Sequence, residues 1–327
     1  TMHGRSRITR HLAWIVVLAL TTLGTSLQAG DITGIVAFGD SLSDTGNTYL
    51  AFGYPPSPPY YQGHYSNGPI WLEYLAGQLG VAAPTPSLAG GTDNAYGFAQ
   101  TGDESTTTPL GPVVPNIGTQ ISTYLASNNN TVGSTQLITI WGGANDFLNG
   151  GVTDPTKPLM NLATEISTLA AAGGKLFMVP NLPLLGDIPA TNTMPQPVRD
   201  ELNLLSSTFD SLLHNEINTL QQSLGITIYQ PNIEALFQNV LANPAAYGFT
   251  NVFDSALADG VLSGQGYLFW DTVHPTTAAG QIIGEVAFAS MVPEPSSMTL
   301  VLIAAPLLLL AWRRRAASHI TRSSAQG

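Results

Sequence analysis

Short apolar runs alternate with longer stretches of helical periodicity along the middle of the chain. Four apolar runs bounded by turn residues predict buried strands, at 34–40, 136–143, 175–183 and 225–232. Apolar residues at helical spacing predict helices between and after them, at 70–79, 116–126, 159–174, 197–223, 233–241 and 276–291. Strands that alternate with helices favour a mainly parallel sheet with both faces covered. We therefore expect an α/β fold, a three-layer α/β/α sandwich.

Two long segments do not follow this pattern. Residues 54–69 (YPPSPPYYQGHYSNGP) are rich in proline and tyrosine, and residues 84–115 are rich in glycine, threonine and proline. We interpret both as insertions at one rim of the sheet, where functional sites are usually built. The apolar and aromatic part at 52–61 favours contact with a lipid-like acyl group, or else forms packed surface.

The N-terminal residues 1–29 have the layout of a secretory signal peptide. A basic start is followed by the apolar run LAWIVVLAL at 12–20 and then by small residues that end at Ala29. The alternative is a short N-terminal membrane anchor, for which the apolar run is too short to span comfortably. We expect cleavage near Ala29.

The C-terminal residues 292–327 carry a second tripartite signal. VPEPSSM at 292–298 precedes an apolar segment at 299–312 and three arginines at 313–315. This arrangement resembles the PEP-CTERM sorting signal, which implies processing by an exosortase-type membrane protease. The alternative is an ordinary tail anchor. Either interpretation, together with the export machinery that a signal peptide requires, places the domain at 30–291 in the periplasm, at the cell surface or outside the cell, with a transient or permanent membrane anchor.

Charge and composition narrow the function of the central domain. The chain has 327 residues, and its segment 30–291 holds three basic residues against twenty acidic ones, a net charge of −17. Such a surface repels nucleic acids and anionic membranes, so we expect no nucleic-acid partner. The chain has no cysteine, which excludes disulfides and thiolate metal sites. About 260 residues suffice for a hydrophobic core.

A serine follows the first predicted strand in the motif FGDSLSDTGN at 38–47. These small and polar residues are typical of a turn and a helix N-cap, which would expose Ser41 at the positive end of a helix. A serine nucleophile needs a base and a group that orients the base. The spacing in FWDTVHPTTAAG lets one turn bring Asp271 to His274. The alternative is that Asp271 and Thr276 cap the following helix.

Two other histidines and two other loops could contribute to a serine site of this kind. We interpret His214 as a surface or partly packed residue of the long helix, and His64 as loop surface that could touch substrate. In WGGANDF at 141–147, the Asn145 amide after a strand could donate to an oxyanion or simply form an Asx turn. In GGTDNAYGFAQTG at 90–102, a glycine-rich turn could aim a backbone N–H at the same oxyanion or be a plain loop. Motifs for nucleotide binding, for a zinc protease and for a GxSxG elbow are absent.

Along the chain these four motifs stand in the order 38–47, 90–102, 141–147 and 269–280. They resemble the GDSL esterase/lipase family, also called SGNH hydrolases, in the family's order and over most of residues 34–290. The resemblance implies an SGNH/flavodoxin-like fold. It also implies that Ser41 is the nucleophile and gives its own N–H to the oxyanion hole, that Asn145 supplies a side-chain donor, that His274 is the base and that Asp271 orients it. Related sequences carry two glycines where this chain has Gly97-Phe98. Either Gly97 or Phe98 would then supply the backbone donor.

The expected function is hydrolysis of a carboxylic ester through an acyl-enzyme, without metal or cofactor. The substrate would be a lipid-like ester or an acylated sugar. One alternative is a carbohydrate O-deacetylase or acyltransferase that works in an exopolysaccharide layer. The alternative from another class is a catalytically silent surface or matrix-binding protein whose site is blocked by Phe98.

Overall fold

The computed structural model describes residues 32–292. The chain divides into two units, Thr1–Ala289 and Ser290–Gly327, and the fold presented below belongs to the first. The predicted signal peptide at 1–29 lies outside the described residues, as does the predicted sorting segment apart from its first residue. Within residues 32–292, no helix is long and apolar enough to cross a membrane.

The centre of the fold is a parallel sheet. Its strands are buried apolar runs whose order is β1-β4-β5-β6, with bounds Gly34–Gly39 (β1), Gln136–Trp141 (β4), Leu176–Met178 (β5) and Thr227–Tyr229 (β6). Neighbouring strands pair in parallel throughout this sheet. Strands buried on both faces are continuously apolar, which is why the sequence pattern found them. The predicted parallel sheet is confirmed.

A fifth segment extends the sheet beyond β1. The Ala37 N–H donates to the Thr92 carbonyl at 3.0 Å, and the Asn94 N–H donates to the Ala37 carbonyl at 2.8 Å, so this segment runs parallel to β1. Counted with it, the strands follow the flavodoxin-like order 2-1-3-4-5. The order reverses between β1 and β4, and the carboxyl ends of strands at such a point commonly form a binding site.

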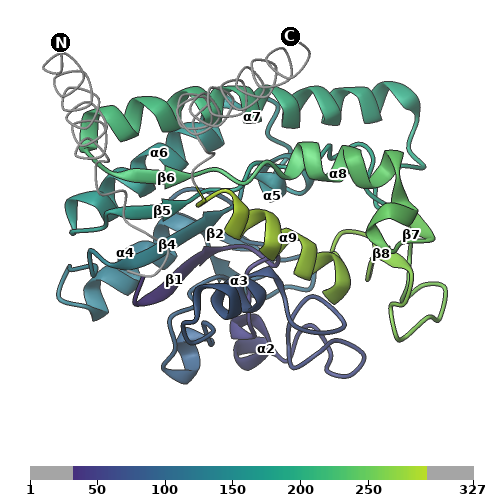
Figure 1. Cartoon of the computed structure of the whole chain (residues 1–327), viewed down its shortest axis with the longest axis horizontal. Helices are drawn as coiled ribbons and strands as arrows, with labels where there is room; N and C mark the ends of the chain where they lie inside the picture. Colours follow the sequence, from purple (N-terminus) through teal and green to yellow (C-terminus); the bar gives the residue numbers. More distant parts are fainter. Residues whose placement is uncertain (1–31, 293–327) are drawn as a thin grey trace, which may run out of the picture. The chain divides into compact units, whose positions relative to one another are not determined.

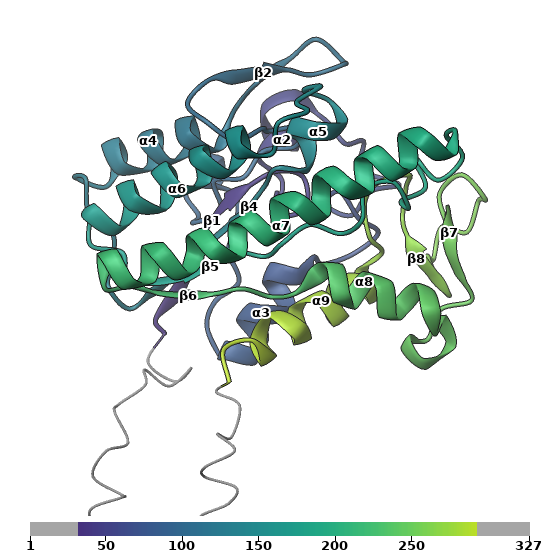
Figure 2. The same ribbon diagram turned by 90° about the horizontal axis from the view of Figure 1, so that it is seen from above.

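Helices cover both faces of the sheet. Figure 2 shows three helices on one face, α4 (Ile117–Ser127), α6 (Thr156–Ala171) and α7 (Gln196–Leu224). The other face carries α3 (Trp71–Leu79), α8 (Ile233–Ala242) and α9 (Thr277–Ala289), as Figures 1 and 2 both show. The three-layer sandwich and its six predicted helices are therefore confirmed, with helix ends shifted by at most three residues.

Several shorter elements were not predicted because they lack apolar periodicity. They are α2 (Asn47–Phe52), α5 (Ala144–Leu148), the antiparallel pair β2 (Ser105–Thr107) and β3 (Val113–Pro115), the parallel pair β7 (Asn251–Ser255) and β8 (Tyr267–Phe269), and the 3-10 turns η2 (Ser87–Ala89) and η3 (Pro244–Tyr247). The predicted strand at 175–183 is shorter than expected. The strand ends at Met178, although Val179 still donates to the Tyr229 carbonyl at 2.9 Å, and Pro180 and Pro183 beyond it have no N–H to donate.

Close packing of α3 against α9 fixes the position of the loop that precedes α9. A Cβ on Gly284 would lie 3.0 Å from the Trp71 carbonyl oxygen and 2.8 Å from the Tyr74 Cβ, so a larger side chain would force the two helices apart. At the start of α9, the Thr277 N–H donates to the Asn67 side chain at 2.9 Å. These contacts bring residues 270–276 beside the segment that follows β1.

Two carboxyl groups are buried beneath the helices on one face. Glu165 of α6 accepts the Gly102 N–H at 2.8 Å, and Asp210 of α7 accepts the Leu182 N–H at 2.9 Å. Burial raises the pKa of each to about 8, against the lowering effect of these hydrogen bonds. Both groups therefore favour the protonated, neutral form in the folded chain.

We predict that Glu165→Gln reduces the dependence of stability on pH. The pKa of Glu165 is raised from 4.5 to about 8 on folding, so the native state keeps a proton that the unfolded state releases in that window. The contribution of Glu165 to the free energy of unfolding is therefore most favourable below its unfolded-state pKa of 4.5, and it is lost as pH rises toward its folded-state pKa of about 8. Thermal melts at about pH 5 and about pH 8 should show a lower melting temperature for the wild type at the higher pH, and a smaller difference for the variant.

Glu201→Gln is the matched control because Glu201 is an exposed residue of α7. It should melt like the wild type at both pH values. The same pH difference in Glu165→Gln as in the wild type would contradict the burial argument.

Candidate active site

The strand β1 ends at Gly39, a position that has no room for a side chain. A Cβ on Gly39 would lie 2.5 Å from the Trp141 carbonyl oxygen of β4. The buried side chain of Gln120 on α4 then binds both backbone groups of Gly39, since Oε1 accepts its N–H at 3.0 Å and Nε2 donates to its carbonyl at 2.9 Å. The end of the strand is thus held from two sides before the chain turns.

Ser41 lies in a tight turn, as the motif predicted, but it does not stand at the start of a helix. The N–H groups of Ser43 and Asp44 both donate to the Asp40 carbonyl at 3.0 Å, which closes the turn. The next helix, α2, begins only at Asn47. Ser41 is also 8% exposed rather than open at the surface.

Asp44 explains why the motif looked like a cap. Its Oδ1 accepts the N–H groups of Gly46 and Asn47 at 2.8 and 2.6 Å, so the carboxylate caps α2. Its Oδ2 accepts the N–H of Thr48 at 3.2 Å and that of Gly97 at 3.0 Å. One buried carboxylate therefore joins the segment after Ser41 to the glycine-rich turn.

His274 and Asp271 stand in line with Ser41. The His274 Nε2 lies 2.7 Å from the Ser41 Oγ, and the His274 Nδ1 lies 2.7 Å from the Asp271 Oδ2. The other carboxylate oxygen of Asp271 accepts the N–H groups of Val273 and His274, each at 2.8 Å. The carboxylate thus caps its own turn rather than α9, and the Thr276 hydroxyl accepts the Ala279 N–H at 3.4 Å.

The electrostatics of this line suit proton transfer from the serine. Burial alone would raise the pKa of Asp271, but the charge of His274 and the hydrogen bonds from His274 and Val273 outweigh it and hold the pKa at about 2. An ionised carboxylate at Nδ1 keeps the imidazole proton on that nitrogen. Nε2 is then free to accept the proton of Ser41.

The Asn145 side chain is oriented by its neighbours. It lies in the short helix α5, so it does not form a simple Asx turn. Its Oδ1 accepts from Asn149 Nδ2 at 2.8 Å, while its Nδ2 donates to the Ala99 carbonyl at 3.0 Å and lies 3.5 Å from the Asp40 Oδ2. One amide N–H is therefore bound by the Ala99 carbonyl, and the other faces Asp40, which precedes Ser41.

Hydrogen bonds distinguish Gly97 from Phe98. The Gly97 N–H donates to the Asp44 Oδ2 at 3.0 Å and to the Thr48 Oγ1 at 2.8 Å, so it already has two acceptors. Among residues 32–292, the N–H groups of Phe98 and Ser41 have no acceptor. Phe98 has a φ of 68°, a left-handed conformation in which glycine is usual.

Asp40 was not among the predicted site residues. Its Oδ1 accepts the Leu42 N–H at 2.9 Å, and its Oδ2 faces the Asn145 amide. Burial raises the pKa of Asp40 to about 6, and the Leu42 hydrogen bond and the charge of His274 oppose that rise. Asp40 therefore links the serine turn to the amide donor.

The two other histidines of residues 32–292 make no hydrogen bond to Ser41. His64 is buried rather than part of the loop surface, with Nδ1 2.9 Å from the Tyr61 carbonyl and Nε2 3.2 Å from Glu73. His214 is exposed on α7 and pairs with Gln230 at 2.9 Å. Within the described part of the chain, no cluster of three or more histidine, aspartate or glutamate side chains could hold a metal ion.

Comparison with known proteins identifies the family of this chain. The sequence profile of the family described as GDSL-like Lipase/Acylhydrolase matches residues 35–287. The chain belongs to this family. It is therefore a carboxylic ester hydrolase of the GDSL type.

Relatives of this GDSL protein include enzymes that act on acyl groups. The phosphatidylcholine-sterol acyltransferase of Aeromonas hydrophila is 28% identical over 332 residues, covering 84% of this chain and 95% of that protein. The thermolabile hemolysin of Vibrio parahaemolyticus is 27% identical over 284 residues, covering 80% of this chain and 64% of that protein. Among solved structures, the phospholipase A1 of Streptomyces albidoflavus covers 80% of this chain and is itself covered completely (100%), with 16% identity and a TM-score of 0.43.

Two tyrosines of the segment 54–69 contact the catalytic candidates of this GDSL protein, and sequence reasoning missed both. The Tyr60 hydroxyl donates to the Asp271 Oδ2 at 2.8 Å. The Tyr65 ring lies 4.8 Å from the His274 ring, centroid to centroid, at a tilt of 40°. The tyrosine content of the segment marked it as unusual, but no local spacing connects it to residues more than two hundred positions away.

We predict that Tyr60→Phe lowers kcat about tenfold and leaves KM nearly unchanged, because a hydrogen bond to a charged group contributes roughly 1.5–3 kcal/mol. The lost hydroxyl frees Asp271 to move, so His274 is held less firmly toward Ser41. Steady-state kinetics on an activated ester measures the change.

Tyr61→Phe is the matched control, because the Tyr61 hydroxyl bonds to no residue among 32–292. It should retain the wild-type kcat. A purely structural role for Tyr60 would instead lower the melting temperature without changing the kcat of the folded enzyme.

Proposed function

We propose that this chain is an exported serine esterase or lipase that cleaves carboxylic esters through an acyl-enzyme on Ser41. One observation carries the proposal. An unbroken line of hydrogen bonds, each of 2.7 Å, runs from the Asp271 carboxylate through His274 to the Ser41 hydroxyl. A nucleophile, its base and the orienting acid in this order are the parts that acyl transfer needs.

In the acylation step, His274 Nε2 takes the proton as the Ser41 Oγ attacks the ester carbonyl. Asp271 stabilises the imidazolium that forms. The developing oxyanion is met by the backbone N–H groups of Ser41 and Phe98 and by the Asn145 amide. His274 then gives its proton to the departing alcohol, which leaves the acyl group on Ser41.

In the deacylation step, a water molecule takes the place of the alcohol. His274 removes a proton from the water as its oxygen attacks the acyl carbonyl, and the proton returns to the Ser41 Oγ as the acid is released. The same donors hold the second oxyanion. Every proton in this cycle passes through Nε2, so the cycle needs neither a metal nor a cofactor.

Acyl transfer to an alcohol is the second candidate function. The relative from Aeromonas hydrophila is named an acyltransferase, and the acyl-enzyme is common to both reactions. An acceptor alcohol would replace the water in deacylation. Phe98 packs against Tyr54 and Tyr65, at centroid distances of 6.0 and 6.2 Å. The ester assay below tests the alternative of a silent site blocked by the Phe98 side chain.

Export is supported by the signals at the two ends of the sequence. Residues 1–29 have the layout of a signal peptide, and residues 292–327 resemble a PEP-CTERM sorting signal. We infer that the domain acts outside the cytoplasm after removal of the first segment. An exosortase-type protease would process the second.

We predict that the purified protein hydrolyses p-nitrophenyl esters and that Ser41→Ala lowers kcat by about 10⁴ or more. Asn145→Ala should lower kcat by about two to three decades in a protein that still folds, since one oxyanion donor contributes roughly 3–4 kcal/mol. Initial rates of p-nitrophenol release measure both effects.

The control is Ser122→Ala, since Ser122 is exposed on α4. It should behave like the wild type. Wild-type activity in Ser41→Ala would refute the acyl-enzyme mechanism.

The mass of the protein recovered from its host reports export in the same preparation, and an unprocessed chain would contradict that part of the proposal.

A further inference from the structure

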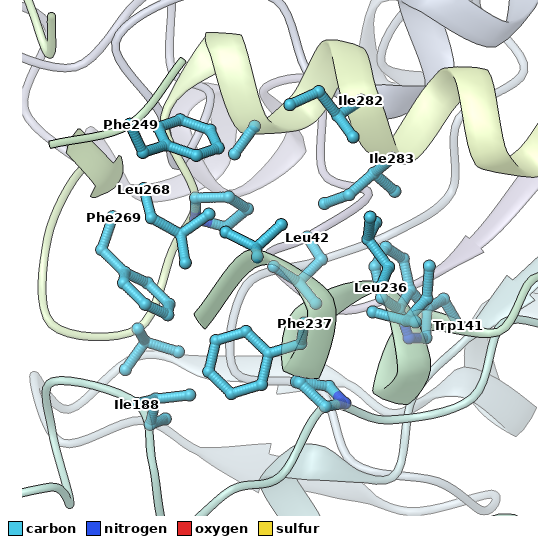
Figure 3. Close-up of a pocket in the computed structure, with 16 residues that line it drawn as sticks. Leu42, Trp141, Ile188, Leu236, Phe237, Phe249, Leu268, Phe269, Ile282 and Ile283 are labelled. Atoms are coloured by element: carbon cyan, nitrogen blue, oxygen red, sulfur yellow. The ribbon is translucent and has the colours of Figure 1, made fainter. Parts of the chain in front are cut away.

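We propose that an apolar cavity between α8 and α9 binds the acyl chain of the ester and selects chains of medium length. This inference rests on the proposed acyl-enzyme at Ser41 and adds the substrate class. Figure 3 shows the cavity, which has a volume of about 80 Å³. It lies in a hydrophobic core of its own that includes Phe237 of α8 and Ala279 of α9.

The lining of the cavity is apolar on every side. Leu236, Phe237 and Val240 line it from α8, and Ala279 and Ile282 line it from α9. A water molecule needs two to four polar partners to be stable in such a space, and these side chains provide none. Protein interiors rarely contain voids larger than a water molecule, so a cavity of this size suits an apolar ligand.

The cavity begins next to the nucleophile. Leu42, the neighbour of Ser41, lines it, and so do Val273 and Pro275 on either side of His274. In Figure 3, Leu42 lies between Leu268 and Leu236.

A smaller hollow of about 10 Å³ touches Ser41 itself, and Leu42 and Pro275 line both spaces. The half-buried Leu42 side chain is thus part of the wall of both spaces. In this proposal, a change in the Leu42 rotamer joins them.

The shape and chemistry favour an acyl chain over the other half of an ester. The acyl carbon bonded to Ser41 must carry its chain away from the oxyanion donors, and the cavity is an apolar space lined by the sequence neighbours of Ser41 and His274. A sugar hydroxyl placed there would lose its hydrogen bonds to water without replacement. The proline- and tyrosine-rich segment 54–69, by contrast, uses Tyr60 and Tyr65 to contact Asp271 and His274.

The test compares acetyl and octanoyl p-nitrophenyl esters. The wild type should prefer the octanoyl ester by at least about tenfold in kcat/KM, since each buried methylene contributes about a fourfold gain. Ala279→Leu adds three carbons inside the cavity and should lower the octanoyl-to-acetyl ratio about tenfold. Phe237→Leu enlarges the cavity and should shift the preference toward the dodecanoyl ester.

The matched control is Ala278→Leu, because Ala278 precedes Ala279 on α9 but is exposed. It should keep the wild-type ratio. Circular dichroism and thermal melts confirm that each variant is folded, and if Ala279→Leu is not, the shift in Phe237→Leu decides the question. If the folded variants show the same dependence of kcat/KM on acyl-chain length as the wild type, the proposed acyl pocket is contradicted. A wild type that prefers the acetyl ester contradicts it as well. Absence of hydrolysis of any ester would instead refute the proposed function.

Discussion

The hydrogen bond between His274 Nε2 and Ser41 Oγ is the interaction on which the site depends. It joins two loops whose residues are 233 positions apart in the sequence, at a distance of 2.7 Å. Neither loop could hold this distance alone. The Ser41 loop is fixed at Gly39, whose backbone N–H and carbonyl are both hydrogen-bonded by Gln120 at the end of β1. The other is fixed by the close approach of α9 to α3, which Gly284 permits.

Buried carboxylates organise what surrounds this bond. Asp271 receives hydrogen bonds from Tyr60, His274 and Val273, so its negative charge is stabilised at the base of the line. Asp44 ties the turn after Ser41 to the Gly97 segment. A chain with few basic residues must satisfy such groups with N–H and O–H donors, because cations are scarce. The polar residues around Ser41 are thereby held by hydrogen bonds, whereas the apolar region beyond Leu42 contains a cavity.

Sequence patterns predicted the features that depend on local order. The strands β1 and β4 and the helices α7 and α8 follow from periodicity, and the spacing of Asp271 and His274 allows a single turn to join them. Other features depend on contacts between distant segments.

Nothing near Tyr60 indicates that its hydroxyl meets a carboxylate far along the chain. The sequence around Gly97 does not indicate that Asp44 and Thr48 accept its N–H. The motif does contain the predicted turn and cap, but the capping residue is Asp44 and its helix begins at Asn47, so Ser41 does not stand at the helix end. In each case the missing information is tertiary, so a local motif could not supply it.

The activation of Ser41 by His274 is the central claim, and covalent trapping tests it most directly. A fluorophosphonate forms a stable bond with an activated serine, and peptide mass spectrometry locates that bond. We predict a single adduct on Ser41 in the wild type and its loss in His274→Ala. An adduct on another serine, or equal labelling of Ser41 without His274, would contradict the account.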